Sequence, residues 1–175
     1  MTNGGIIWIG RLEDALISNS FVLHVQPIVP VLDPLQRHHY EVLVRLREEN
    51  GDMIPPMAFI PAAERYGFMP KLDRWVIENT FKAFSNIRDE ASREVHFSIN
   101  VSGASMGDET TKKFLRGLFG YYGVPYHAIT FEITETEAIG NMTNALCFIN
   151  EFRDLGCKFA LDDFGCGLSD RKSVV

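Results

Sequence analysis

The strongest constraint on the fold is a regular alternation of strand-like and helix-like segments along the chain. Short stretches rich in β-branched and aromatic residues are separated by longer stretches whose apolar residues recur at helical spacing. Each strand-plus-helix repeat takes about 30 residues. The strand-like stretches are residues 21–29, 40–46, 95–101, 128–134 and 158–162. This rhythm predicts parallel strands joined by right-handed helical crossovers, as in α/β proteins.

Helices are predicted before and between these strands. They are expected around residues 8–17, 59–66, 72–84, 114–119 and 144–155. Gly156 follows the last of them and is expected to end it, because glycine adopts the left-handed backbone conformation at a helix terminus without strain. Pro27 lies inside the first strand. Since proline cannot donate a ladder hydrogen bond, that strand is expected to lie at an edge or to end there.

Two architectures contain such repeats, a doubly wound sheet and a TIM-type (β/α) barrel. A doubly wound sheet would carry a glycine-rich phosphate loop after an early strand, and the sequence has no GxGxxG or Walker pattern. We therefore favour the barrel. A complete barrel takes about 250 residues, whereas this chain has 175. The expected fold is an incomplete α/β barrel with about five of the eight strands, lacking its C-terminal part.

Composition and charge exclude several classes of protein. The net charge of −6 argues against a protein that holds duplex nucleic acid on a broad basic face. No apolar run approaches the roughly 18 residues of a membrane span, and the first residues lack the pattern of a signal peptide, so a cytoplasmic protein is expected. The 3 cysteines and 5 histidines show no zinc-binding spacing. Any bound metal is therefore expected to have oxygen ligands.

Acidic and amide side chains recur at or near the C-terminal ends of successive predicted strands. They are Glu41, Asn100, Glu132 with Glu135, and Asp162 with Asp163. In a barrel these strand ends converge on the face where active sites form. Carboxylates crowded there repel one another unless a divalent cation neutralises them, and hard oxygen ligands suit Mg²⁺, Mn²⁺ or Ca²⁺. Two such ions are the usual device for hydrolysing a phosphodiester.

Several short segments occur in an order and spacing typical of one family. They are QPI at 26–28, EVLVR at 41–45, FIPAAE at 59–64, NVS at 100–102, EITE at 132–135 and DDFG at 162–165. The segment 41–45 resembles the signature of the EAL domain, with Val42 in place of its alanine, and the resemblance extends from about residue 8 to about residue 169. It implies a (β/α) barrel whose first strand is antiparallel to the rest. It also implies hydrolysis of cyclic di-GMP to linear pGpG with Mg²⁺ or Mn²⁺.

The resemblance implies a role for each member of the acidic cluster. A first metal ion would be bound by Glu41, Asn100, Glu132 and Asp162. Asp162 would bridge to a second ion, held also by Asp163. Glu135 would be a supporting acid near the two ions. The expected catalytic residues are thus Glu41, Glu135 and Asp163.

The resemblance also implies residues that bind the substrate. Gln26 would face a guanine base, and Arg45, with Leu43 beside it, would hold a phosphate, a task that suits the planar guanidinium group. Structural roles are open for the same side chains. Arg45 could pair with Glu64, and Gln26 could bond to strand backbone. Phe164 is as readily a packing residue as a functional one.

The sequence departs from the family pattern after residue 165. The family continues into a strand with a lysine that helps to activate water, and Lys172 follows Asp162 too closely to be that lysine. The chain therefore resembles a C-terminally truncated EAL domain. Residues 1–20 would form an entry helix that connects to an upstream signalling domain, and residues 21–175 would form the partial EAL domain.

Three hypotheses for the function follow from this pattern. The first is a cyclic di-GMP phosphodiesterase domain, impaired by its truncation, so whether this chain is an active enzyme is left open. The second is a catalytically inactive receptor for cyclic di-GMP or a protein-interaction module. The third is an unrelated Mg²⁺ barrel of the enolase type, which would want a Lys or His base on a later strand. Because an incomplete barrel would leave the edge of strand 158–162 unpaired, self-association is also expected.

Overall fold

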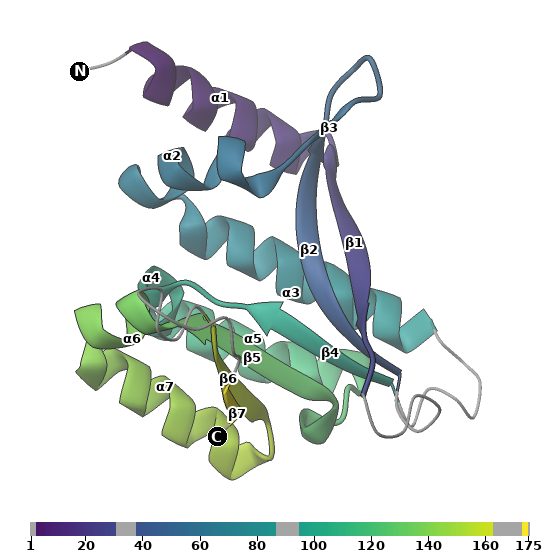
Figure 1. Ribbon diagram of the computed structural model, residues 1–175, viewed down its shortest axis with the longest axis vertical. Helices are drawn as coiled ribbons and strands as arrows, with labels where there is room; N and C mark the ends of the chain where they lie inside the picture. Colours follow the sequence, from purple (N-terminus) through teal and green to yellow (C-terminus); the bar gives the residue numbers. More distant parts are fainter. Residues whose placement is uncertain (1–2, 31–37, 87–94, 163–172, 175) are drawn as a thin grey trace.

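A single twisted sheet runs through the molecule (Figure 1). The computed structural model describes residues 3–30, 38–86, 95–162 and 173–174. The strands are β1 (Phe21–Ile28), β2 (His38–Arg47), β3 (Met53–Ile54), β4 (Val95–Asn100), β5 (Ile129–Thr134), β6 (Lys158–Asp162) and β7 (Ser173–Val174). Their order in space is β1-β2-β4-β5-β6-β7, and β3 pairs with β2. Strands β2, β4, β5 and β6 are parallel, whereas β1 is antiparallel to β2 and β7 to β6.

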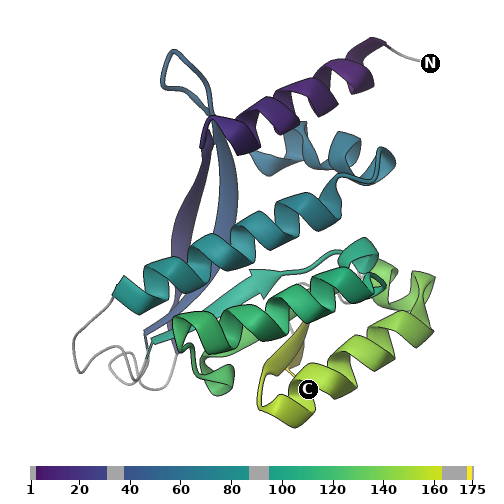
Figure 2. The same cartoon turned by 180° about the vertical axis from the view of Figure 1, so that it is seen from behind.

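One helix precedes the first strand, and the others lie in the connections between the parallel strands. They are α1 (Asn3–Ile17), α2 (Ile60–Arg65), α3 (Met69–Asn86), α4 (Gly103–Met106), α5 (Glu109–Tyr122), α6 (Glu135–Gly140) and α7 (Met142–Leu155). In Figure 2, α3, α5 and α7 lie in front of the strands, on one side of the sheet. The α/β class and the antiparallel first strand are thereby confirmed. Among the described helices, none is long and apolar enough to cross a membrane.

The face of the sheet that meets the helices is apolar. Since successive side chains of a strand point to opposite faces, every second residue contributes to it. On β5 the ring of Phe131 packs against those of Phe148 and Phe152 on α7, with centroids 5.5 and 5.7 Å apart. On β2 the buried residues Val42 and Leu46 belong to the same core. Burial of these side chains is the main stabilising contribution to the layer between helices and sheet.

Helix α1 contributes to this core. Leu12 and Ala15 are buried, and the indole of Trp8 lies 6.3 Å from the ring of Phe59. On the exposed side of the helix, Lys71 Nζ lies 3.1 Å from a carboxylate oxygen of Glu13. The segment expected to be an entry helix is therefore packed against the rest of the fold, through side chains spaced one helical turn apart.

The strands predicted from the sequence correspond to β1, β2, β4, β5 and β6. Gly156 ends α7 with φ of 111°, as expected, and β1, which contains Pro27, lies at the end of the sheet order. The sequence pattern missed β3, β7, α4 and α6. The expectation that the edge of β6 would be open is corrected by β7, which pairs with it at Ala160 and Leu161.

Candidate functional site

The opposite face of the sheet collects the polar side chains of four neighbouring strands. Glu41 on β2 is level with Ser98 on β4, and Asn100 at the end of β4 is level with Glu132 on β5. Asp162 at the end of β6 is level with Thr134. Because laterally paired residues point to the same face, the register brings Glu41, Asn100, Glu132 and Asp162 to one side of the sheet.

Two of these side chains are in direct contact. The amide Nδ2 of Asn100 donates a hydrogen bond to Glu41 Oε1 at 3.4 Å. The carboxylate of Glu132 is almost completely buried, with a relative exposure of 2%. A buried carboxylate on the polar face of a sheet is costly unless hydrogen bonds or a cation compensate it. The cluster thus has the composition expected of an oxygen-ligand site.

In the described part of the chain, the carboxylates of this cluster lie too far apart to enclose one ion. Within that part, no three His, Cys, Asp or Glu side chains stand close enough together to bind one metal. The donor set still fits Mg²⁺ or Mn²⁺ chemically, since carboxylate and amide oxygens from adjacent strands are the ligands such ions prefer. Asp163, the further expected ligand, and Phe164 lie outside the described residues. Glu135, the expected supporting acid, is the first residue of α6 and is half-buried.

The residues expected to bind substrate lie on the same face, on β1 and β2. Gln26 is exposed and is the register partner of Glu41. Leu43 and Arg45 alternate with Glu41 along β2 and are half-buried. Arg45 Nη1 donates to the carbonyl of Val44 at 2.8 Å. The expected side chains for base and phosphate therefore lie on the same face of the sheet as the acidic cluster.

A groove of about 390 Å³ lies next to the cluster. Its walls are mostly apolar and come from β2, α2 and α3, including Leu43, Ile60 and Leu72. Asn100 and Glu132 line its polar edge. A largely apolar cavity with a few convergent polar groups is typical of a small-molecule site.

Sequence reasoning missed Asp73, which lines the same groove from α3. Its side chain is buried and accepts hydrogen bonds from Ser102 and Ser105. Burial raises its pKa to about 6, although these hydrogen bonds act in the opposite direction. A signal was present in the sequence, because Asp73 falls within the apolar stripe of its helix, between Leu72 and Val76.

Glu137 was missed as well. Its backbone N–H donates to Thr134 Oγ1 at 3.3 Å, and Thr134 Oγ1 donates to Glu137 Oε2 at 3.0 Å. The sequence T-E-T-E at 134–137 has the pattern of a capping box, a recognisable helix start. The other carboxylate oxygen, Oε1, accepts a hydrogen bond from Gly103 N at 2.8 Å.

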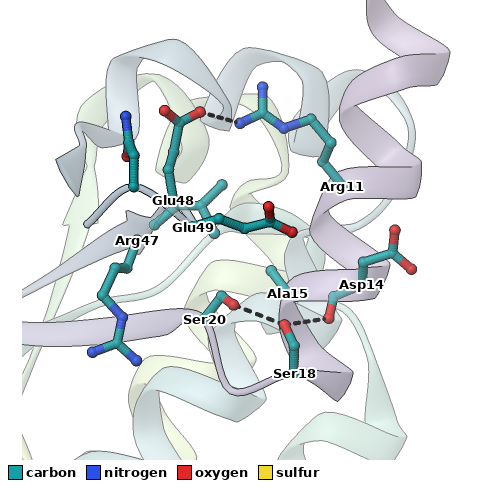
Figure 3. Close-up of a pocket in the computed structure, with 10 residues that line it drawn as sticks. Arg11, Asp14, Ala15, Ser18, Ser20, Arg47, Glu48 and Glu49 are labelled. Carbon is teal, nitrogen blue, oxygen red and sulfur yellow. Dashed lines mark hydrogen bonds and ion pairs between the residues drawn. The ribbon is translucent and has the colours of Figure 1, made fainter. Parts of the chain in front are cut away.

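A larger cavity, of about 660 Å³, lies between the end of α1 and the turn after β2 (Figure 3). There Arg11 and Glu48 form an ion pair at 2.7 Å. Ser18 Oγ donates to the carbonyl of Asp14 at 2.8 Å. None of the expected site residues lines this cavity. This cavity is a surface hollow between two elements, lined by polar groups that are largely exposed to solvent. It is a different place from the acidic cluster.

Comparison with known proteins places this geometry in a family. The model of the EAL domain family matches residues 9–174. The chain is 36% identical over 162 residues to cyclic di-GMP phosphodiesterase PdeB of Shewanella oneidensis, covering 93% of this chain and 19% of that protein. It is 32% identical over 163 residues to cyclic di-GMP phosphodiesterase PdeF of Escherichia coli K12, covering 93% and 21%. The chain thus spans about a fifth of the length of these relatives.

Solved structures agree with this relationship. The FimX EAL domain from Pseudomonas aeruginosa, solved bound to c-di-GMP, aligns with a TM-score of 0.82 at 31% identity, covering 92% of this chain and 64% of that one. The PaMucR phosphodiesterase, solved as a c-di-GMP complex, shares the fold with a TM-score of 0.81 at 22% identity, covering 93% and 66%. The match therefore includes both the EVLVR segment and the barrel-type arrangement of strands. The chain belongs to the EAL domain family.

Proposed function

We propose that this chain is part of a cyclic di-GMP phosphodiesterase, which hydrolyses the cyclic dinucleotide to linear pGpG. The observation that carries the proposal is the register of β2, β4, β5 and β6, which sets Glu41, Asn100, Glu132 and Asp162 on one face. Two relatives more than 30% identical are named cyclic di-GMP phosphodiesterases. EAL phosphodiesterases are metal-dependent in general, which agrees with an oxygen-rich donor set.

We assign two Mg²⁺ or Mn²⁺ ions to this face. Glu41, Asn100, Glu132 and Asp162 would hold the first, and Asp162 with Asp163 the second. When bound, such ions lower the pKa of a bound water molecule and offset negative charge on the phosphate. The contribution of Asn100 begins before metal binding, because its amide orients the carboxylate of Glu41. Glu135, at the start of α6, would act as the supporting acid.

The substrate would lie across β1, β2 and the groove. Arg45 would hold a phosphate through its guanidinium group, after exchanging its bond to the Val44 carbonyl for one to the ligand. Leu43 would support it from the groove wall, and Gln26 would face a guanine. The apolar walls suit a purine base, since burying its ring faces removes apolar surface from water.

A second candidate function is binding of cyclic di-GMP without hydrolysis. The observation in its favour is the FimX EAL domain, 31% identical to this chain, which was solved bound to c-di-GMP. Both candidates use the same face of the sheet. They differ in whether the bound dinucleotide is cleaved.

Chromatography of cyclic di-GMP incubated with the protein separates the two candidates. Formation of pGpG with Mn²⁺, its loss in EDTA and its loss in Glu41→Gln are expected for the enzyme. Retention of intact cyclic di-GMP in equilibrium dialysis, without pGpG, would favour the receptor. Absence of both binding and cleavage would contradict both.

Location and partners extend the proposal. We propose a cytoplasmic chain, since Cys157 is a buried free thiol and unpaired cysteines agree with a reducing compartment. A connection from α1 to an upstream signalling domain and an absence of duplex nucleic acid binding remain predictions. So does self-association, for which β1, at the end of the described sheet order, offers an edge.

A further inference from the structure

The loop after β4 is held from two sides by carboxylates. From α3, Asp73 Oδ2 accepts hydrogen bonds from Ser102 N at 3.0 Å, Ser102 Oγ at 2.6 Å and Ser105 Oγ at 2.6 Å. From α6, Glu137 Oε1 accepts a hydrogen bond from Gly103 N at 2.8 Å. Two consecutive backbone N–H groups are thus bound by side chains from different helices. This arrangement fixes the loop relative to both of its neighbours.

The cost of placing Asp73 there argues for a specific use. Asp73 has a relative exposure of 5%, so its carboxylate is removed from water. The cation next to it in the chain, Arg74, pairs with a different carboxylate, Asp108, at 2.7 Å. Glu137 adds a repulsive negative charge. Since an apolar residue in this stripe would avoid the desolvation of a carboxylate, helix packing alone does not account for Asp73.

The clamped loop begins directly at the proposed site. Ser102 follows Asn100 by two residues, and between them Val101 N donates to the Glu132 carbonyl at 2.9 Å. This loop therefore continues directly from the ladder between β4 and β5, next to the residue whose amide meets Glu41. Asp73 lines the same groove as Asn100 and Glu132, and the hydrogen bonds described for its carboxylate come from Ser102 and Ser105.

We propose that Asp73, together with Glu137, is a positioning residue that clamps residues 102–103 and so sets the Asn100 amide against Glu41. This assignment rests on the proposed function for its catalytic consequence. The clamp itself is a structural claim. It can be tested even if the chain binds no nucleotide.

The first test follows the Asn100 side-chain amide by ¹H–¹⁵N NMR, with its signal identified by its loss in Asn100→Asp. In Asp73→Leu, which suits the apolar stripe, the signal is expected to shift or broaden. The matched control is Thr80→Val, which removes another buried polar group from the same helix, one that bonds only to the Val76 carbonyl in the described contacts. An unmoved signal in Asp73→Leu, with native circular dichroism, would overturn the clamp.

The second test measures Mn²⁺ affinity by calorimetry and separates kcat from KM for cyclic di-GMP. Loss of a residue that orients metal ligands typically lowers metal affinity by about tenfold or more. We expect that loss and a lower kcat in Asp73→Leu, with neither in Thr80→Val. If Asp73→Leu fails to fold, Ser105→Ala removes one bond to the carboxylate and is expected to show the same changes in weaker form.

The outcomes distinguish the two proposals. A wild-type chain that binds neither Mn²⁺ nor cyclic di-GMP overturns the proposed function and the catalytic role of Asp73, and the NMR result then decides the clamp alone. A wild-type chain that binds both, with unchanged affinity and kcat in Asp73→Leu, overturns the positioning role and leaves the proposed function standing. Equal losses in Thr80→Val would also overturn the positioning role, because they would reflect general destabilisation.

Discussion

On β5, Phe131 points to the helices and its neighbour Glu132 points to the opposite face of the sheet. Both side chains are buried, with relative exposures of 0% and 2%. Phe131 is surrounded by the aromatic rings of α7, so its burial stabilises the fold. Glu132 is a carboxylate among polar strand residues, so its burial is unfavourable without compensation. One strand thus carries stability on one face and the proposed chemistry on the other.

The largest effect is expected on the apolar face. Phe131→Ala should lower the free energy of unfolding by about 3–5 kcal/mol, because it removes a large buried ring and leaves a cavity. Urea denaturation followed by circular dichroism measures this change. The matched variant on the polar face, Glu132→Gln, keeps a hydrogen-bonding side chain of nearly the same size and leaves no cavity, so it should lower the free energy of unfolding by much less than Phe131→Ala does. Equal destabilisation by both variants would contradict the division between the faces.

Asp73 interrupts this division, because it places a carboxyl group on the helix side of the sheet. Its pKa is raised from 3.8 to about 6, so the folded state binds the proton more tightly than the unfolded state. The free energy of unfolding should therefore fall by on the order of 3 kcal/mol as the pH rises from about 4 to about 6, and stay level above that.

Denaturation across this pH range tests the effect against Asp73→Asn, which lacks the titrating group and should lose this decrease. Asp108 is the internal contrast, since hydrogen bonds from Thr110, Thr111 and Arg74 lower its pKa. Its contribution is present at neutral pH and is lost as the pH falls. A decrease between pH 4 and 6 that is the same in Asp73→Asn would assign it to other groups.

The polar face is expected to control metal binding without controlling the fold. Glu41→Ala combined with Asp162→Ala should reduce Mn²⁺ affinity at least a hundredfold, because two carboxylate ligands are removed. Calorimetry measures the loss. The control is Cys157→Ser, which changes a buried thiol that is not one of the expected ligands and should leave the Mn²⁺ affinity unchanged. Loss of binding in the Cys157 variant alone would contradict the assignment of oxygen ligands.

Local patterning predicted the two faces, and long-range contacts account for most of what it missed. The alternation along residues 41–46 assigned Val42 and Leu46 to the side away from Glu41, and both are buried in the core. Asp73, by contrast, meets Ser102 at a separation of 29 residues, which no local pattern encodes. The partners of a polar residue in an apolar stripe become visible only when the helix is placed against the sheet.

The short elements were missed for related reasons. Strand β7 has only two residues and pairs antiparallel to β6, so neither periodicity nor the βα repeat predicts it. Helix α6 could have been predicted, because its capping-box pattern at 134–137 is a local signal. The ligand roles of Glu41, Asn100, Glu132 and Asp162 came from the family resemblance. Their common face follows from the register.

The most direct test of the polar face is titration of cyclic di-GMP into the protein with Mn²⁺ present, comparing two arginines on β2. Arg45 lies two residues from Leu43, which lines the groove, whereas Arg47 lines the hollow beside α1 (Figure 3). Both substitutions to alanine remove one positive charge from the same strand. The account predicts at least a tenfold weaker binding in Arg45→Ala and a change below about twofold in Arg47→Ala. Equal effects of the two substitutions, or a wild-type protein that does not bind cyclic di-GMP, would contradict it.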